Sequence, residues 1–166
     1  MQQQSNAHVT KGDATARRQL VATCAAFFIL GVTFATWATR IPAIRDHALL
    51  TPATLGYVLL GKGVGTIVIM PVVVTAIHRF GAKLTTLGFG VITIAVLMPM
   101  VLSPNWQILT IVLLLSGAAA SGFNIAINAL GSKIEVTTGR SHMSTIHSWF
   151  GVGNFVGAII GTGMGS

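Results

Sequence analysis

The segment His78 to Lys83, with the sequence HRFGAK, is a short polar stretch between two long apolar runs. One run covers residues 54–77 and the other covers residues 84–102. Each is long enough to cross a lipid bilayer, which takes about 20 predominantly apolar residues. The six residues therefore predict a turn at a membrane surface. Arg79 and Lys83 predict that this surface is cytoplasmic, because short cytoplasmic loops are rich in Lys and Arg.

The composition of the whole chain also indicates a protein whose solvent is mostly lipid. Hydrophobic residues make up 52% and charged residues 8%, and the mean hydropathy is +0.78. The net charge of +7 comes from expected hairpins and the N-terminal segment, without a basic face, so we expect no nucleic-acid partner. Cys24 is the single cysteine, which excludes an intrachain disulfide and favours a packing role.

The expected architecture is an all-α integral membrane domain with about five transmembrane helices. Residues 1–16 are polar and without periodicity, which predicts a disordered cytoplasmic tail. Arg17 and Arg18 precede an apolar run that resembles a signal peptide, but the run is too long and further spans follow. Residues 17–166 form the membrane domain, with helices expected at about 20–40, 54–77, 84–102, 107–130 and 145–166.

The distribution of Lys and Arg predicts the orientation of these spans. With the turn at residues 78–83 inside, seven basic residues fall on the cytoplasmic side, whereas Arg40 and Arg45 fall outside. We therefore expect a cytoplasmic N-terminus. The seven are Lys11, Arg17, Arg18, Arg79, Lys83, Lys133 and Arg140.

Polar residues inside the spans need partners, because lipid offers none. Thr33, Thr36, Trp37 and Arg40 share one stripe of the first helix, although Trp37 also suits a position at the headgroup level. Lys62 lies well inside the second span, where it either faces a cavity or snorkels outward. The third span, whose polar side chains are threonines, is expected to face lipid.

The span 107–130 has the most continuous polar face. Gly117, Ser121, Asn124 and Asn128 recur at helical spacing along it. The two carboxamides need a hydrogen-bonding partner, which is another helix, water or a ligand. Both interpretations, helix association and ligand binding, remain open from the sequence.

The last span, 145–166, carries glycines at every fourth position, which predicts close packing against another helix. His147 and Asn154 lie on a second stripe, where a structural histidine is the commoner case. The glycines are Gly153, Gly157, Gly161 and Gly165.

Acidic residues are too few and too dispersed for a hydrolytic or phosphotransfer site. Asp13, Asp46 and Glu135 lie in the tail or in expected loops. Metal-assisted catalysis needs histidines and carboxylates gathered in one place. We therefore expect no enzyme activity, no catalytic residues, no metal site and no cofactor.

Several of these segments resemble the N-terminal part of a major facilitator superfamily transporter. Arg79, Gly81 and Lys83 match the Arg, Gly and basic positions of that family's inside loop between helices two and three. His78 stands where the family usually has an acid, and Val74 where it has a leading glycine.

A second inside loop and three longer segments extend the resemblance over nearly all of residues 20–166. Glu135 and Arg140 resemble the acid and the arginine of the family's next inside loop. The segments ATWATRIP (35–42), GFNIAINALGSKIE (122–135) and GRSHMSTIHSWFGVGNFVGAIIG (139–161) are similar to fucose-permease-type permeases of the bacterial inner membrane.

The resemblance implies a secondary active transporter that moves a small polar solute by alternating access. The cations Arg40 and Lys62 indicate an organic anion as the solute, whereas a sugar fits the asparagines equally well. Family members have twelve spans in two halves, so we expect this chain to be part of the first half. A proton site, if there is one, is expected at His147 or in a further segment. The alternative is a small membrane protein that does not transport and instead binds other chains through its glycine face.

The resemblance also implies roles for individual residues. In the family, helices one and four line the solute cavity, and the inside loops take part in gating. The cytoplasmic gating residues are then Arg79, Gly81, Lys83, Glu135 and Arg140. The candidate cavity residues are Arg40, Asn124, Asn128, Lys62, Trp37, His147 and Asn154.

Overall fold

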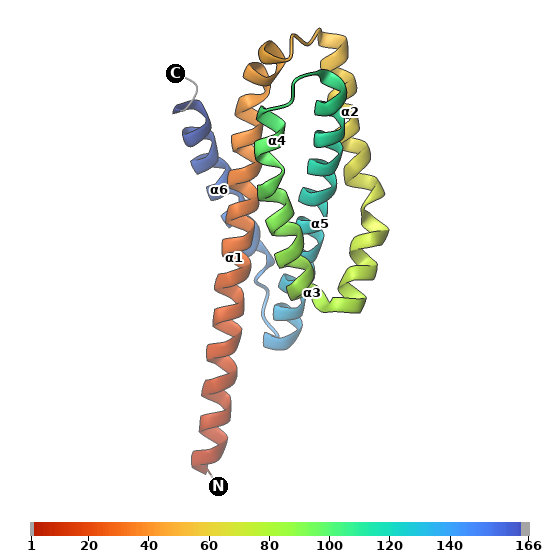
Figure 1. The fold of residues 1–166 in the computed structure, drawn as a ribbon. Helices are drawn as coiled ribbons and strands as arrows, with labels where there is room; N and C mark the ends of the chain where they lie inside the picture. The colour runs from red at the N-terminus through yellow and green to blue at the C-terminus, as the bar shows by residue number, and fades with distance from the viewer. Residues whose placement is uncertain (1, 164–166) are drawn as a thin grey trace.

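The computed structural model describes the backbone of residues 2–163 and the side chains of residues 15–163. This part of the chain is all-helical, as predicted, and contains no strand (Figure 1). The helices are α1 (Gln2–His47), α2 (Pro52–Val68), α3 (Met70–Ala95), α4 (Leu97–Val101), α5 (Trp106–Thr138) and α6 (Met143–Gly163).

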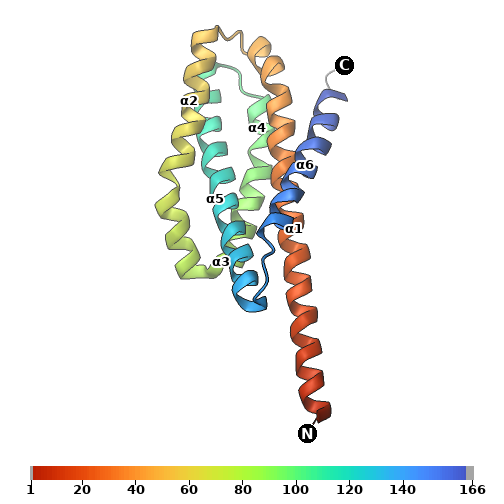
Figure 2. The ribbon, with the colours of Figure 1, turned by 180° about the vertical axis from the view of Figure 1, so that it is seen from behind.

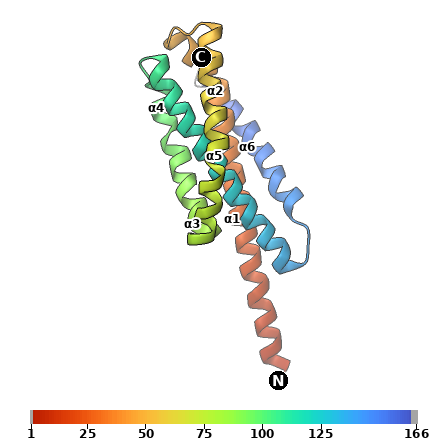
Figure 3. The ribbon, with the colours of Figure 1, turned by 90° about the vertical axis from the view of Figure 1, so that its right-hand side faces the viewer.

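The helices form an up-and-down bundle around α1 and α5. Helix α6 packs mainly on α1, whereas α2 and α3 pack mainly on α5, and α1 contacts α5. The views in Figures 1, 2 and 3 agree that α6 lies on one side of α1 and that α2 and α4 lie on the other. The loops at residues 48–51 and 102–105 lie at one end of the bundle, opposite the turn near Gly81 and the loop before α6.

The turn predicted at HRFGAK is present and depends on Gly81. Helix α3 is interrupted at Gly81, whose backbone is not helical, with φ 82° and ψ 154°. Only glycine adopts this region without a steric cost. The chain therefore reverses direction at Gly81, as Figure 1 shows, and the apolar runs on either side form separate arms of a hairpin.

Two smaller interruptions divide the predicted spans. The helix is interrupted at Ile69, before Pro71, and again at Val96, before Pro99. A proline inside a helix removes a donor, and its ring clashes with the carbonyl four residues earlier. The predicted span 54–77 therefore covers α2 and the start of α3, and the span 84–102 covers the rest of α3 with α4.

Three helical stretches in the described part of the chain are long and apolar enough to cross a membrane. They are Thr15–His47, Pro52–Val101 and Trp106–Thr138. The second has 50 residues and reverses at Gly81, so the three stretches contain four of the five predicted spans. Helix α6 is not among them, although its 21 residues give it the length of a span.

The N-terminal segment differs from the sequence prediction. Residues 2–16, which we expected to form a disordered tail, continue α1 as regular helix. The segment contains Gln, Ala and Lys, which have high helix propensity, and it extends a helix that is already nucleated.

The glycine face of α6 packs closely against another helix, which is α1. Gly153, Gly157 and Gly161 are buried, and a Cβ at any of them would meet α1. At Gly153 it would meet the carbonyl of Phe28, and at Gly161 the hydroxyl of Thr39. Gly165, the fourth glycine of this face, lies outside the described residues.

Close contacts also join α5 to the hairpin. A Cβ at Gly65 would meet the carbonyl of Leu114, and a Cβ at Gly117 would meet the carbonyl of Lys62. The expectation that the third span faces lipid is wrong for one of its faces. Thr85 and Thr93 are buried, and each hydroxyl donates to the carbonyl four residues earlier, so threonine can pack between helices without an unpaired polar atom.

Candidate functional site

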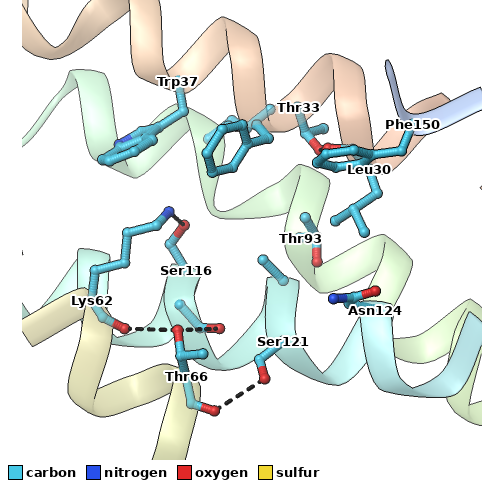
Figure 4. Close-up of a pocket in the computed structure, with 14 residues that line it drawn as sticks. Leu30, Thr33, Trp37, Lys62, Thr66, Thr93, Ser116, Ser121, Asn124 and Phe150 are labelled. Atoms are coloured by element: carbon cyan, nitrogen blue, oxygen red, sulfur yellow. Dashed lines mark hydrogen bonds between the residues drawn. The ribbon is translucent and has the colours of Figure 1, made fainter. Parts of the chain in front are cut away.

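A cavity of about 270 Å³ lies where α1, α2, α3 and α5 meet (Figure 4). One wall is largely apolar and aromatic, and the opposite wall carries hydroxyls, an ammonium and a carboxamide. The residues around the cavity are Leu30, Thr33, Phe34, Trp37, Lys62, Thr66, Thr93, Leu97, Ser116, Gly117, Ala120, Ser121, Asn124 and Phe150.

Lys62 points into this cavity, so the outward-snorkelling alternative is wrong. Its Nζ lies 3.9 Å from the centroid of the Trp37 ring and 3.4 Å from the Oγ of Ser116. Figure 4 shows the side chain extending from α2 toward α1. A cation over an aromatic face is attracted by the ring quadrupole, and the attraction increases when water is excluded. Trp37 is only 9% exposed, and it lines the cavity wall.

Below Lys62, hydrogen bonds join α2 to α5. Ser121 Oγ donates to the carbonyl of Thr66 at 3.0 Å, and Thr66 Oγ1 is 3.5 Å from the carbonyl of Gly117. Within α2, Thr66 Oγ1 also donates to the carbonyl of Lys62 at 3.1 Å. These bonds satisfy the hydroxyls in an apolar setting. Gly117 lets α5 approach the backbone carbonyl of Lys62 closely. This close approach also holds the backbone of Lys62 in place.

The two asparagines of α5 have different places. Asn128 Nδ2 donates to the backbone carbonyl of Asn124 at 2.9 Å and to its Oδ1 at 2.8 Å. Asn124 lines the cavity, whereas Asn128 lies one turn further along and is not part of the lining. The bond to Oδ1 sets the orientation of the Asn124 amide, which directs its NH₂ group toward the rest of the cavity (Figure 4).

Besides Asn128, three predicted cavity residues are not part of the lining. Arg40 lies near the end of α1, one turn beyond Trp37. The His147 ring stacks at 4.7 Å from the ring of Phe27, in a tilted arrangement between α6 and α1. Asn154 Nδ2 donates to the carbonyl of Phe150 at 3.2 Å, which is a bond within α6.

Comparison with known proteins identifies the kind of chain to which this cavity belongs. An uncharacterized MFS-type transporter of Yersinia pestis is 34% identical over 140 residues, which is 84% of this chain and 36% of the relative. The chain matches part of a transporter of the major facilitator superfamily (MFS). An uncharacterized transporter of Sinorhizobium fredii is 29% identical over 81% of this chain, and the membrane protein MosC of Rhizobium meliloti is 26% identical over 82%.

The chain spans about 36% of the length of these curated relatives. No family model and no solved structure matches it. None of the three relatives is named as a fucose permease, so the likeness to that branch stays a prediction. The apolar helices and the relatives together make this a bacterial multi-pass membrane protein.

The inside-loop residues of the MFS pattern lie at one end of the bundle, where Glu135 has a structural role. Its Oε1 accepts hydrogen bonds from the backbone N–H groups of His142 and Met143, at 2.7 and 2.9 Å. It also accepts from the hydroxyl of Ser141 at 3.1 Å. The carboxylate thus caps α6, whose first N–H groups have no partner in their own helix. Among the described side chains, the ion pair joins Arg45 to Asp46, and Glu135 does not pair with Arg140.

Most of the residues that line the cavity were not among the predicted candidates. Thr66 lies one helical turn after Lys62, so the i to i+4 rule would have placed it on the same face. Ser116 precedes a glycine of the α5 polar face. Phe34 and Phe150 line the opposite wall, and large apolar residues in a lipid-facing sequence carry no pattern that marks them as cavity residues.

Proposed function

We propose that the gene product to which this chain belongs is a secondary active transporter that moves a small polar solute by alternating access. The observation that carries the proposal is the cavity itself. Lys62 and Asn124 lie inside an otherwise apolar bundle of a chain that matches part of an MFS transporter. Ionisable and carboxamide groups are expensive inside a membrane, and they usually mark a solute or ion pathway.

The packing supports a rigid-body mechanism. Gly65 and Gly117 let the backbones of α2 and α5 touch, and Gly157 does the same for α1 and α6. Helices joined by such contacts move together. Alternating access then requires this bundle to rock against a second one around a central site, as in transporters built from paired repeats.

The proposed orientation places the N-terminus in the cytoplasm of a cell whose inner membrane holds the protein. It is supported by Arg79, Lys83 and Arg140, which lie at the same end of the bundle as the start of α1. In a Cys24→Ser background, an impermeant thiol reagent applied to intact spheroplasts should label Thr51→Cys but not Ser141→Cys. Labelling of Ser141→Cys alone would reverse the orientation.

Uptake by the purified gene product in proteoliposomes tests the transport proposal. A panel of labelled neutral sugars and organic anions should contain at least one solute with saturable uptake, and Asn124→Ala should reduce that uptake without reducing the amount of protein in the membrane. An exposed control, Thr145→Ala, should leave uptake unchanged. If no solute of the panel shows saturable uptake, the proposal fails.

The same vesicles test proton coupling, which we propose as the driving force. An inward pH gradient should accelerate uptake, and His147→Gln should reduce this acceleration. Uptake that ignores the gradient would remove proton coupling and leave transport itself intact.

The alternative function, an interaction partner without transport, is not favoured by the packing. It relied on a glycine face of α6 that is free to meet another chain. Gly153, Gly157 and Gly161 are already covered by α1.

A further inference from the structure

The cavity holds a positive charge for which the described part of the chain supplies no carboxylate. Lys62 Nζ faces the Trp37 ring and the Ser116 hydroxyl, neither of which carries a negative charge. We infer that the solute is an organic anion and that its carboxylate binds Lys62. This inference rests on the proposed transport function and narrows its solute from any small polar molecule to one class.

The acidic residues of the chain have other places. Asp46 binds Arg45 at 2.8 Å and is not part of the cavity lining. Glu135 is occupied by the start of α6 through three hydrogen bonds. Asp13 lies near the N-terminus, outside the described side chains. A charge inside a membrane protein is normally paired, so the solute is the natural source of the missing negative charge.

The donors around Lys62 suit a carboxylate better than a phosphate. One ammonium and one serine hydroxyl can together satisfy the two oxygens of a carboxylate. Phosphate sites usually gather several cations, an arginine fork or a helix N-terminus. Among the residues that line the cavity, Lys62 is the one cation.

The other residues that line the cavity indicate the chemistry of the remaining part of the solute. At the end away from Lys62, the Asn124 amide is held by Asn128, and its NH₂ group offers a donor to a hydroxyl or carbonyl oxygen. Between the two ends, Phe34 and Phe150 form an aromatic wall. The geometry therefore fits a carboxylate at one end, an oxygen function at the other, and an apolar side between them.

Trp37 gives this site a spectroscopic readout. It lies 3.9 Å from the ammonium, and its buried Nε1 has no hydrogen-bond partner among the described residues. Its emission should therefore respond when a carboxylate draws Lys62 away from the ring. The chain has three tryptophans, so Trp106→Phe and Trp149→Phe leave Trp37 as the single reporter.

The test is a fluorescence titration of the purified gene product with two matched pairs of probes. Gluconate is compared with the neutral sugar glucose, and mandelate is compared with its neutral amide. We expect at least one carboxylate to bind about 10-fold or more tightly than its neutral partner, in line with the strength of charge-assisted hydrogen bonds. Lys62→Met should abolish the difference within that pair, whereas Lys62→Arg should retain most of it.

Lys133→Met is the matched control, because it removes an exposed positive charge at the far end of α5. It should leave the preference for the carboxylate unchanged. If neither carboxylate binds better than its neutral partner, or if Lys62→Met keeps the preference, the inference is overturned. Uptake of glucose with no response to gluconate would overturn it while the transport proposal survives. Binding of a carboxylate without any uptake would support the inference while the transport proposal fails.

Discussion

Replacing Gly157 with alanine should separate α1 from α6, whereas the same change at Gly151 should not. A Cβ at Gly157 would lie 2.5 Å from the carbonyl oxygen of Val32, 2.9 Å from its Cα and 3.0 Å from the Cβ of Ala35. At Gly151 the added Cβ would meet nothing within 4 Å. Both glycines lie in α6, so the pair isolates the effect of the interface.

The size of the effect follows from two opposing terms. Alanine favours a helix over glycine by about 1 kcal/mol, and this gain is shared by both sites. Overpacking at Gly157 costs about 1–3 kcal/mol, and it tends to the upper value because two of the three neighbouring atoms belong to the backbone and cannot rotate away. The free energies of unfolding of the two variants should therefore differ by about 1–3 kcal/mol, which is roughly 5- to 150-fold in the equilibrium constant.

Unfolding by SDS in mixed micelles measures this difference. Trp149 is a local reporter, because its ring meets that of Phe28 edge-on at 6.3 Å across the interface between α6 and α1. Gly157→Ala should lose this signal at a lower SDS fraction than the wild-type chain, and Gly151→Ala at an equal or higher one. If both variants unfold at the same SDS fraction, the glycine face does not hold the two helices together and the reasoning fails.

Three further variants test other parts of the molecule. Gly81→Ala should destabilise the hairpin by about 1–2 kcal/mol relative to Gly88→Ala in the same titration, because Gly81 has a positive φ and Gly88 does not, and equal losses would contradict this. Glu135→Gln should increase hydrogen exchange at the two amides that it binds, since a neutral oxygen is a weaker acceptor, and unchanged exchange would refute the cap. Asn128→Ala should reduce uptake about 10-fold, more than membrane abundance, because it releases the Asn124 amide, whereas equal losses would indicate packing alone.

The sequence predicted those parts of the fold that depend on local patterns. The turn at HRFGAK was predictable because Arg79 and Lys83, between two apolar runs, are unfavourable in lipid, and Gly81 supplies the required backbone conformation. The packing face of α6 was predictable from the four-residue spacing of its glycines. The partner of that face was not, because the spacing fixes which side of a helix is flat and says nothing about which helix meets it.

The predictable site residues are those whose polar or charged side chain lies inside a membrane span, where it is energetically unfavourable without a partner. Lys62 and Asn124 were found by this argument, and both line the cavity. The argument also selected Asn128 and His147, since it recognises a polar group that needs a partner without identifying the partner. For Asn128 the partner is Asn124, and for His147 it is the ring of Phe27.

The distinction between a polar group that joins helices and one that waits for a solute can be drawn from its remaining capacity. The side-chain NH₂ group of Asn128 donates to two oxygens of Asn124 within α5. The hydroxyls of Thr66 and Ser121 donate to backbone carbonyls. The Lys62 ammonium has three N–H donors. Its hydrogen bond to the Ser116 hydroxyl is weak, because the two atoms are 3.4 Å apart. Lys62 and the Asn124 amide line the same cavity, so a ligand that satisfies both must reach from α2 to α5 along the aromatic wall formed by Phe34 of α1 and Phe150 of α6.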